Sequence, residues 1–463
     1  MKLTKLSLVA ALLIGSSAFA IENTKVSGDV NLFYGTIDSD AKDAPDMFNK
    51  DASYANASLQ LDLTTDLSDG VSAGVGLTAV STLGLENNLV SGTWSNSHGV
   101  SGSTGSSYAG GAQVDDAAWV DEAWIAGTAL DTTVKVGRQA LDTPLAFTET
   151  WGVDTNTFDA AVMINQSIPG TTLVGAWVGK SNGSSDDENA NYLNGDARGS
   201  LTVNDLGGAQ AGYVAQDGKF NTFAKDGAYA AGIINNSWKP LTVQAWYYDL
   251  QGLAQAYWLQ ADLNIEGILF GAQYANTDLD NVGALVNTVG GHLPAGTTTS
   301  KADDTSMYSV MLGYEMKDVV TVKAAHSSVT DDGTLGMANT ATGAAATVGG
   351  QSKMYTEMWW NYGAVSAVGS DSYSVTAEAT VGPEIELFAG YYFSDIDPDY
   401  NSAAVLNTIF EKQEVTEAVF TVSKSFGPLD TSLAVIWDDY DYEAKATEDY
   451  SATNVQVYLT YNF

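Results

Sequence analysis

The sequence contains no cysteine, three histidines and few basic residues. Without cysteine, the chain cannot form disulfides, thiolate zinc sites, iron–sulfur clusters or a cysteine nucleophile. The histidines (His98, His292 and His326) are far apart, which argues against a histidine-rich metal centre. The chain has 19 Lys and Arg against 56 Asp and Glu, which gives a net charge of −37. Because nucleic-acid binding depends on basic side chains that neutralise phosphates, we expect no nucleic-acid partner. Disorder is also disfavoured, because 45% of the residues are apolar and 10% aromatic.

Long apolar runs are absent after the first 20 residues. Lys2 and Lys5 precede the apolar run Leu6 to Ile14, and Ala18-Phe19-Ala20 follows it. This pattern predicts a secretory signal peptide over residues 1–20, cleaved after Ala20, with a single domain over residues 21–463. Since no later stretch of 18 apolar residues could form a membrane helix, a closed barrel is the remaining way for the exported chain to span a bilayer.

Alternation of apolar and polar residues with a period of two predicts β-strands. It is clearest over residues 454–463 and 55–64 and recurs over 257–264 and 373–381. About eighteen such segments occur, most of them near the ten residues that a tilted strand needs to cross a bilayer. The predicted strands lie near residues 24–36, 53–66, 71–82, 118–129, 133–140, 158–166, 171–180, 227–236, 241–250, 254–264, 268–276, 305–315, 319–329, 372–381, 385–394, 414–424, 429–439 and 452–463.

The connections between these segments alternate between short and long. The short ones are rich in Gly, Pro and Asp, which favour tight turns. A soluble sandwich would also show alternating strands, but it has no reason to sort its connections in this way, whereas an outer-membrane barrel has short turns on one rim and long loops on the other. We therefore predict an all-β fold, a transmembrane antiparallel β-barrel of about 18 strands. Sixteen strands is the alternative, and residues 209–216 could add a strand.

Several short motifs resemble a known family. The leader MKLTKLSLVAALL, the segment Val136-Gly137-Arg138-Gln139, the eighteen-strand count and the terminal Tyr461-Asn462-Phe463 resemble the campylobacterial major outer membrane protein family of porins. The resemblance implies an eighteen-stranded barrel, commonly a homotrimer, that carries small hydrophilic solutes and ions. Some members hold calcium at the constriction, but no ligand set can be transferred to this chain by motif.

The polar phase of the strands predicts which side chains line the pore. Charged side chains are costly on the lipid face, so we assign them to the lumen. For Glu122 the inward assignment follows from Ala123 and Ile125 taking the lipid face, which leaves Asp121 near the rim or on a bulge. The predicted pore-lining residues are Asp62, Glu122, Lys135, Asp262, Lys323, Glu378, Glu386, Glu417 and Asp430.

The segment 141–157 is predicted to fold into the lumen as a constriction loop. It carries Asp142, Glu149 and Asp154 and no basic residue. Arg138 is the candidate cation on the opposite wall, which would require a bulge in its strand; alternatively it only ties down the base of the loop. A lumen dominated by carboxylates predicts a pore that prefers cations.

Two further motifs could indicate ligand binding, but their patterns are incomplete or have a structural explanation. Asp395, Asp397 and Asp399 have the spacing that opens an EF-hand loop, but Tyr400 and Leu406 replace the required Gly and Glu. We therefore expect no cofactor, with a calcium ion at these carboxylates as the lesser alternative. The aromatic pair Trp359-Trp360 could stack sugars, although packing within its own long loop is favoured.

The leading function is an outer-membrane porin for passive diffusion of ions and small hydrophilic solutes, in contact with lipid and lipopolysaccharide in the bacterial cell outer membrane. The alternatives are a substrate-selective channel and a surface adhesin or structural barrel. No Ser/His/Asp arrangement or cofactor motif indicates an enzyme.

Overall fold

The computed structural model describes residues 22–42, 44–90, 100–103, 112–114, 117–183, 220–223, 227–251, 254–279, 304–333, 335–341, 350–382, 384–397, 412–443 and 448–463. The predicted signal peptide over residues 1–20 and the extra strand considered at 209–216 lie outside these residues.

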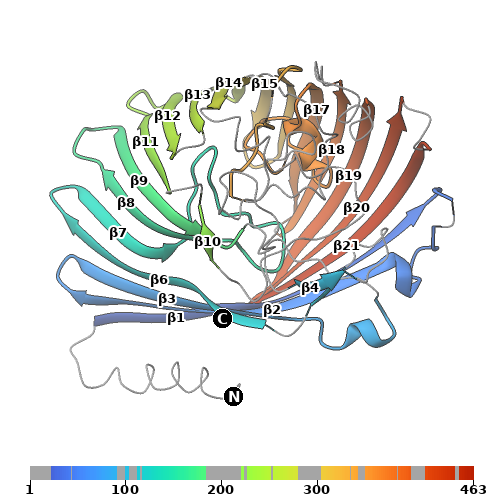
Figure 1. Cartoon of the computed structure of the whole chain (residues 1–463), viewed down its shortest axis with the longest axis horizontal. Coiled ribbons are helices and arrows are strands. Elements are labelled where there is room, and N and C mark those ends of the chain that lie inside the picture. Colours follow the sequence, from blue (N-terminus) through green and yellow to red (C-terminus); the bar gives the residue numbers. More distant parts are fainter. Residues whose placement is uncertain are drawn as a thin grey trace, which may run out of the picture.

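The chain forms one closed antiparallel ring of strands (Figure 1). Its strands are β1 (Glu22–Ser39), β2 (Ser53–Ser68), β3 (Val71–Ser81), β6 (Ala117–Ala129), β7 (Thr132–Gln139), β8 (Phe158–Asn165), β9 (Thr171–Ser181), β11 (Ala228–Asn235), β12 (Leu241–Leu250), β13 (Ala254–Ile265), β14 (Ile268–Leu279), β15 (Thr305–Met316), β16 (Val320–Val329), β17 (Ser370–Val381), β18 (Ile385–Ile396), β19 (Gln413–Phe426), β20 (Leu429–Tyr442) and β21 (Tyr450–Asn462). Each strand pairs with its neighbour in sequence, and β1 pairs with β21 to close the ring. The eighteen-strand prediction is confirmed, and every predicted strand end lies within three residues of the observed one.

The remaining elements are small. The two-residue strand β10 (Asn221–Thr222) pairs with β9, and β4 (Val100–Ser103) pairs with β5 (Ala112–Val114). Short helical turns occur at η1 (Lys50–Ala52), η2 (Leu85–Asn87) and α3 (Tyr362–Ser366). No helix in the described part of the chain is both long and apolar enough to cross a membrane.

Short turns and long connections fall on opposite rims, as the sequence predicts. On the short-turn rim, β6 and β7 are joined by Leu130 and Asp131, both with positive φ (50° and 57°). This conformation matches the twist of a two-residue hairpin. The end of β21 lies on the same rim, where Gly28 and Phe463 exchange two backbone hydrogen bonds of 3.0 Å. The link between β12 and β13 is the one brief connection on the other rim.

The outer face of the barrel is apolar. On β15, Tyr308, Val310, Leu312 and Tyr314 are exposed, whereas Ser309, on the other face, is fully buried. Exposed aromatic side chains gather near strand ends, as in the interfacial girdles of membrane barrels. They include Tyr247, Tyr257, Tyr314, Tyr391, Trp437, Tyr461 and Phe463. An apolar band of this kind on a closed ring needs lipid around it.

Two long connections fold into the ring. The segment 140–157, between β7 and β8, and the described parts of the connection between β16 and β17 (330–333, 335–341 and 350–369) both lie inside the circle of strands (Figure 1, teal trace and orange trace with α3). Their apolar side chains, among them Phe147, Met337 and Val365, are almost fully buried. The first segment was expected inside the lumen. The second was expected only as a long loop, and its position inside the barrel is new.

Candidate functional site

The two infolded segments are joined to each other. Asn339 Nδ2 donates to the carbonyl of Phe147 (2.8 Å), and Phe147 N donates back to Asn339 Oδ1 (3.1 Å). Thr340 N donates to the carbonyl of Leu145 (2.9 Å). Because these are backbone-directed bonds between buried groups, the two segments form one plug with a fixed register.

The acids of the predicted constriction loop have different surroundings. Glu149 is 3% exposed and accepts hydrogen bonds from Trp151 Nε1 (2.9 Å) and Asn339 Nδ2 (3.0 Å). Asp154 is fully buried. Asp142 is exposed and pairs with Lys353 of the second segment (2.9 Å). Glu149 and Asp154 therefore lie within the plug, whereas Asp142 forms an exposed ion pair between its two segments, which contributes little stability.

Glu417 anchors the second segment to the barrel wall. It faces inward on β19, but it is fully buried beneath this segment and does not line open lumen. Its carboxylate accepts from the backbone N–H of Trp359 (2.7 Å), Trp360 (3.0 Å) and Asn361 (2.8 Å). The amide of Asn361 also donates to Asp438 of β20 (2.7 Å). The pore-lining assignment of Glu417 is thus corrected: charge-assisted bonds to three successive N–H groups hold the chain against the wall.

A second anchor joins the segment to another part of the wall, at β13 and β14. The hydroxyl of Tyr355 donates to Asp262 Oδ1 on β13 (2.5 Å). The ring of Tyr355 lies over Gly271, where a Cβ would come within 2.5 Å of the ring carbon Cζ. The absent side chain at Gly271 therefore provides the space for Tyr355, and Asp262 faces the lumen in contact with the plug.

An acidic cavity of about 420 Å³ lies on the short-turn side of the plug. Glu315, Asp318, Glu378 and Glu386 line it. Lys323 pairs with Glu378 across 3.3 Å, at exposed positions where such a pair contributes little stability. The predicted pore-lining residues Glu378, Glu386 and Lys323 thus come together on β16–β18. Glu315 on β15 is a further acid at this cavity that is not among the predicted pore-lining residues.

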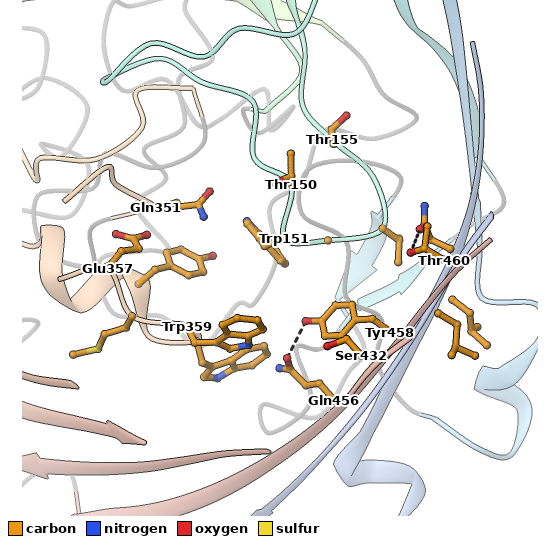
Figure 2. Close-up of a pocket in the computed structure, with 18 of the residues that line it drawn as sticks. Thr150, Trp151, Thr155, Gln351, Glu357, Trp359, Ser432, Gln456, Tyr458 and Thr460 are labelled. Carbon is orange, nitrogen blue, oxygen red and sulfur yellow. Dashed lines mark hydrogen bonds between the residues drawn. The ribbon is translucent and has the colours of Figure 1, made fainter. Parts of the chain in front are cut away.

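An aromatic cavity of about 620 Å³ lies against the plug and shares Trp359 with the acidic cavity. Figure 2 shows Trp151, Trp359 and Tyr458, from three different segments, around this one space. The sequence shows Trp359 and Trp360 as an aromatic pair in a long connection but does not place them in the lumen. The density of aromatic residues in a long connection was the signal that could have done so.

A third group of acids lines the wall at β2, β3 and β6. Asp62 faces inward opposite Gly76, and Glu122 lies opposite the same glycine on the other side. A bulge at Asp121 separates the two phases of β6, so that adjacent Asp121 and Glu122 both point inward. Lys135 faces the lumen with its ammonium 4.2 Å from the Trp124 ring centroid. Asp430 faces inward near the short-turn rim and accepts from Asn462 (2.8 Å).

Arg138 does not line the pore. The pairing of β7 with β8 is regular, so Arg138 takes the outward phase beside Asp159, while buried Gln139 faces inward. Arg138 Nε donates to Asp159 Oδ1 (2.9 Å), and Nη1 donates to the carbonyl of Val120 (2.6 Å). The bulge that an inward Arg138 required occurs in β6 instead. The prediction of a cation opposite the constriction loop is therefore wrong.

The carboxylates considered for calcium do not converge. Asp397 is paired with Lys412 (3.0 Å), an arrangement that disfavours a metal cation. Asp395 takes the outward phase beside Glu414, and Asp399 lies outside the described residues. Within the described part of the chain, no group of three Asp, Glu or His side chains is placed to hold a metal.

Glu357 of the plug gives a pH-dependent prediction. Burial raises the pKa of Glu357 well above its usual value of 4.5; the Ser352 hydrogen bonds oppose this shift, and the charge of Glu149 adds to it. A raised pKa in the folded state means that folding favours the protonated acid, so its stabilising contribution is complete below pH 4.5 and is lost as pH rises through the raised value. Compared with Glu357→Gln, the wild-type barrel should lose thermal stability progressively over that range, as measured by Tm across a pH series. Glu384→Gln, in an exposed turn, is the control; parallel Tm curves for wild type and Glu357→Gln would contradict the prediction.

Comparisons with known proteins bear on the fold. No protein-family model and no curated protein sequence matches the chain. Among solved structures it is similar to Pseudomonas aeruginosa OpdK with vanillate (TM-score 0.62, 11% identity, 95% of this chain and 99% of that chain). It is also similar to P. aeruginosa OccK3 (OpdO; TM-score 0.61, 11% identity, 96% of both chains) and to Acinetobacter baumannii OccAB4 (TM-score 0.58, 12% identity, 96% and 99%). At these identities the likeness shows the fold.

The closed ring, the lipid-facing band and the sorting of turns and loops are those of a bacterial outer-membrane barrel, and this is where the chain resides. Its architecture is that of a porin-type channel: an eighteen-stranded wall around a plug of two infolded segments.

Proposed function

We propose that the protein is an outer-membrane channel that passes small hydrophilic solutes and ions and prefers cations. The observation that carries this proposal is the sign of the charges facing the lumen. Carboxylates line three walls, and among the described residues the inward-facing strand cations are Lys25, Lys135 and Lys323. The inward-facing acids on the strands include Asp62, Glu122, Asp262, Glu315, Glu378, Glu386 and Asp430.

Fixed charges of one sign in a narrow lumen raise the local concentration of the opposite ion. The plug narrows the space in which these charges act, so a passing ion stays within a Debye length, about 8 Å at physiological salt, of the wall. Two cavities that share Trp359 give this passage its internal shape.

Reconstitution in a planar bilayer under a KCl gradient tests the proposal directly. We expect open-channel current with a reversal potential of the sign set by K⁺, decreasing in magnitude as the ionic strength is raised because salt screens the wall charges. An anion-selective reversal potential would contradict the cation preference, and purified protein without conductance would contradict the channel.

A substrate-selective channel is the second candidate, and the aromatic cavity favours it. Selectivity needs a subsite with fixed side chains around it, and this cavity lies against the plug and is lined by both infolded segments and the wall. One similar structure, OpdK, was solved with vanillate. A solute series in which one class passes or binds far more strongly than others of its size would support this candidate.

We also propose that the chain is a homotrimer embedded in lipid and lipopolysaccharide, as the campylobacterial resemblance implies. A monomer mass in detergent at concentrations far above those used for reconstitution would contradict the trimer.

A further inference from the structure

The aromatic cavity differs in chemistry from the rest of the lumen. Six aromatic side chains line it, contributed by both infolded segments and by the wall: Trp151, Trp359, Trp360, Tyr362, Tyr392 and Tyr458. Among the described lining residues there is no Lys or Arg, and Glu357 is the one carboxyl. In a chain with a net charge of −37, this interior surface is unusual, because aromatic rings and neutral polar groups make up nearly all of its polar and aromatic lining.

The rings are held in place before any solute arrives. The Trp151 indole donates to buried Glu149 (2.9 Å), and the Tyr458 hydroxyl donates to Gln456 (2.9 Å; Figure 2). The backbone of Trp359 is bonded to Glu417 (2.7 Å). Its side chain remains 38% exposed in the space that the two cavities share. A solute that binds here therefore meets two rings, Trp151 and Tyr458, whose polar atoms are already bonded, and loses less free energy in ordering the site.

Amide and hydroxyl groups lie around these rings. Gln60, Gln351, Ser432 and Thr460 line the same cavity. Each of these side chains carries hydroxyl or amide groups, which can donate as well as accept hydrogen bonds. Flat apolar faces edged by neutral donors and acceptors match a solute that has an apolar face and hydroxyls around its edge.

We propose that this cavity is a binding subsite for an uncharged cyclic sugar, a monosaccharide or short oligosaccharide, in transit through the channel. The C–H face of a sugar ring is apolar and slightly positive, so it stacks on the negative face of an aromatic ring. Its hydroxyls replace water on the amides and hydroxyls of the wall. The volume of about 620 Å³ lies within the range of small-molecule sites. The proposal rests on the proposed channel function and adds the class of solute.

The test is block of the open-channel KCl current by added solutes in a planar bilayer. D-glucose should reduce the current with a saturable dose dependence. Mannitol, an acyclic polyol with the same number of carbon atoms, should do so only by its effect on bulk conductivity. Equal effects of glucose and mannitol would overturn the proposal, and so would saturable block by choline but not by glucose, which would assign the rings to organic cations.

Variants localise the effect. Trp359→Leu should weaken glucose block roughly tenfold by removing one stacking face, while the cation preference persists because the acids are unchanged. Trp177→Leu removes an indole from the outer face of β9, where it is 41% exposed, and should leave glucose block as in the wild type. Unchanged block in Trp359→Leu would overturn the subsite while leaving the channel intact. Absence of KCl current in the wild type would instead overturn the channel itself.

Discussion

We expect replacement of Glu417 with alanine to release the second infolded segment from the wall and to raise single-channel conductance. The carboxylate accepts three backbone N–H groups and the Asn361 amide, all within 3.1 Å. Without it the three backbone donors lose their partner, at a cost of about 1–3 kcal/mol for each donor left unpaired away from water, while the Asn361 amide keeps its bond to Asp438. A cost of that size shifts the equilibrium between the attached and detached segment by more than an order of magnitude. Conductance and the size limit for neutral solutes should both increase.

Glu414→Ala provides the matched control for this variant. Glu414 is on the same strand, takes the outward phase and is exposed, so its loss removes the same charge without freeing the plug. It should leave conductance unchanged. If Glu417→Ala inserts as a folded barrel with wild-type conductance and wild-type glucose block, then Glu417 does not position the segment.

Changing both Glu378 and Glu386 to lysine should move the channel from cation towards anion preference. The double substitution alters the charge of the acidic cavity by four units at positions that face passing ions. A unit charge at about 4 Å contributes on the order of 1 kcal/mol even in a water-like medium, or a factor of about five in local ion concentration. We expect the permeability ratio of K⁺ to Cl⁻ to fall by at least an order of magnitude, measured from reversal potentials at low salt.

The corresponding control is Asp69→Lys with Glu384→Lys, which makes the same change of charge in exposed short turns outside the lumen. Its permeability ratio should stay close to that of the wild type. Equal shifts in the two double variants would show that overall charge, rather than the acidic cavity, determines ion preference.

The wall of the barrel could be predicted from sequence, because each strand repeats a period-two pattern over about ten residues. A barrel that is lipid-facing outside and wet inside makes that pattern unambiguous. The short turns could also be predicted from sequence, because their backbone conformations favour particular residues. The count of eighteen therefore followed from many weak signals that agree.

The interior was less predictable, because it depends on bonds between distant residues. Nothing in the local sequence shows that Asn339 binds Phe147 or that Glu417 binds the backbone at Trp359. In the sequence, Glu417 takes the same inward phase as the pore-lining acids. It differs from them only because the second infolded segment covers it. The pore-lining prediction for Arg138 was wrong for another reason. A single inserted residue reverses which face the following residues of a strand take, and the bulge occurs at Asp121 in β6 rather than beside Arg138 in β7.

The closure of the ring between β1 and β21 has a consequence for how the barrel forms. Asn31 and Thr460 are hydrogen-bonded neighbours although 429 positions separate them in the chain. No partial product of synthesis can complete this seam, and until it forms both β1 and β21 present unpaired edges that can recruit other strands. Pairing of such distant segments is also intrinsically slow. Assembly is therefore exposed to aggregation until its last step, and a chain shortened within β21 should fail as a whole rather than yield a smaller barrel.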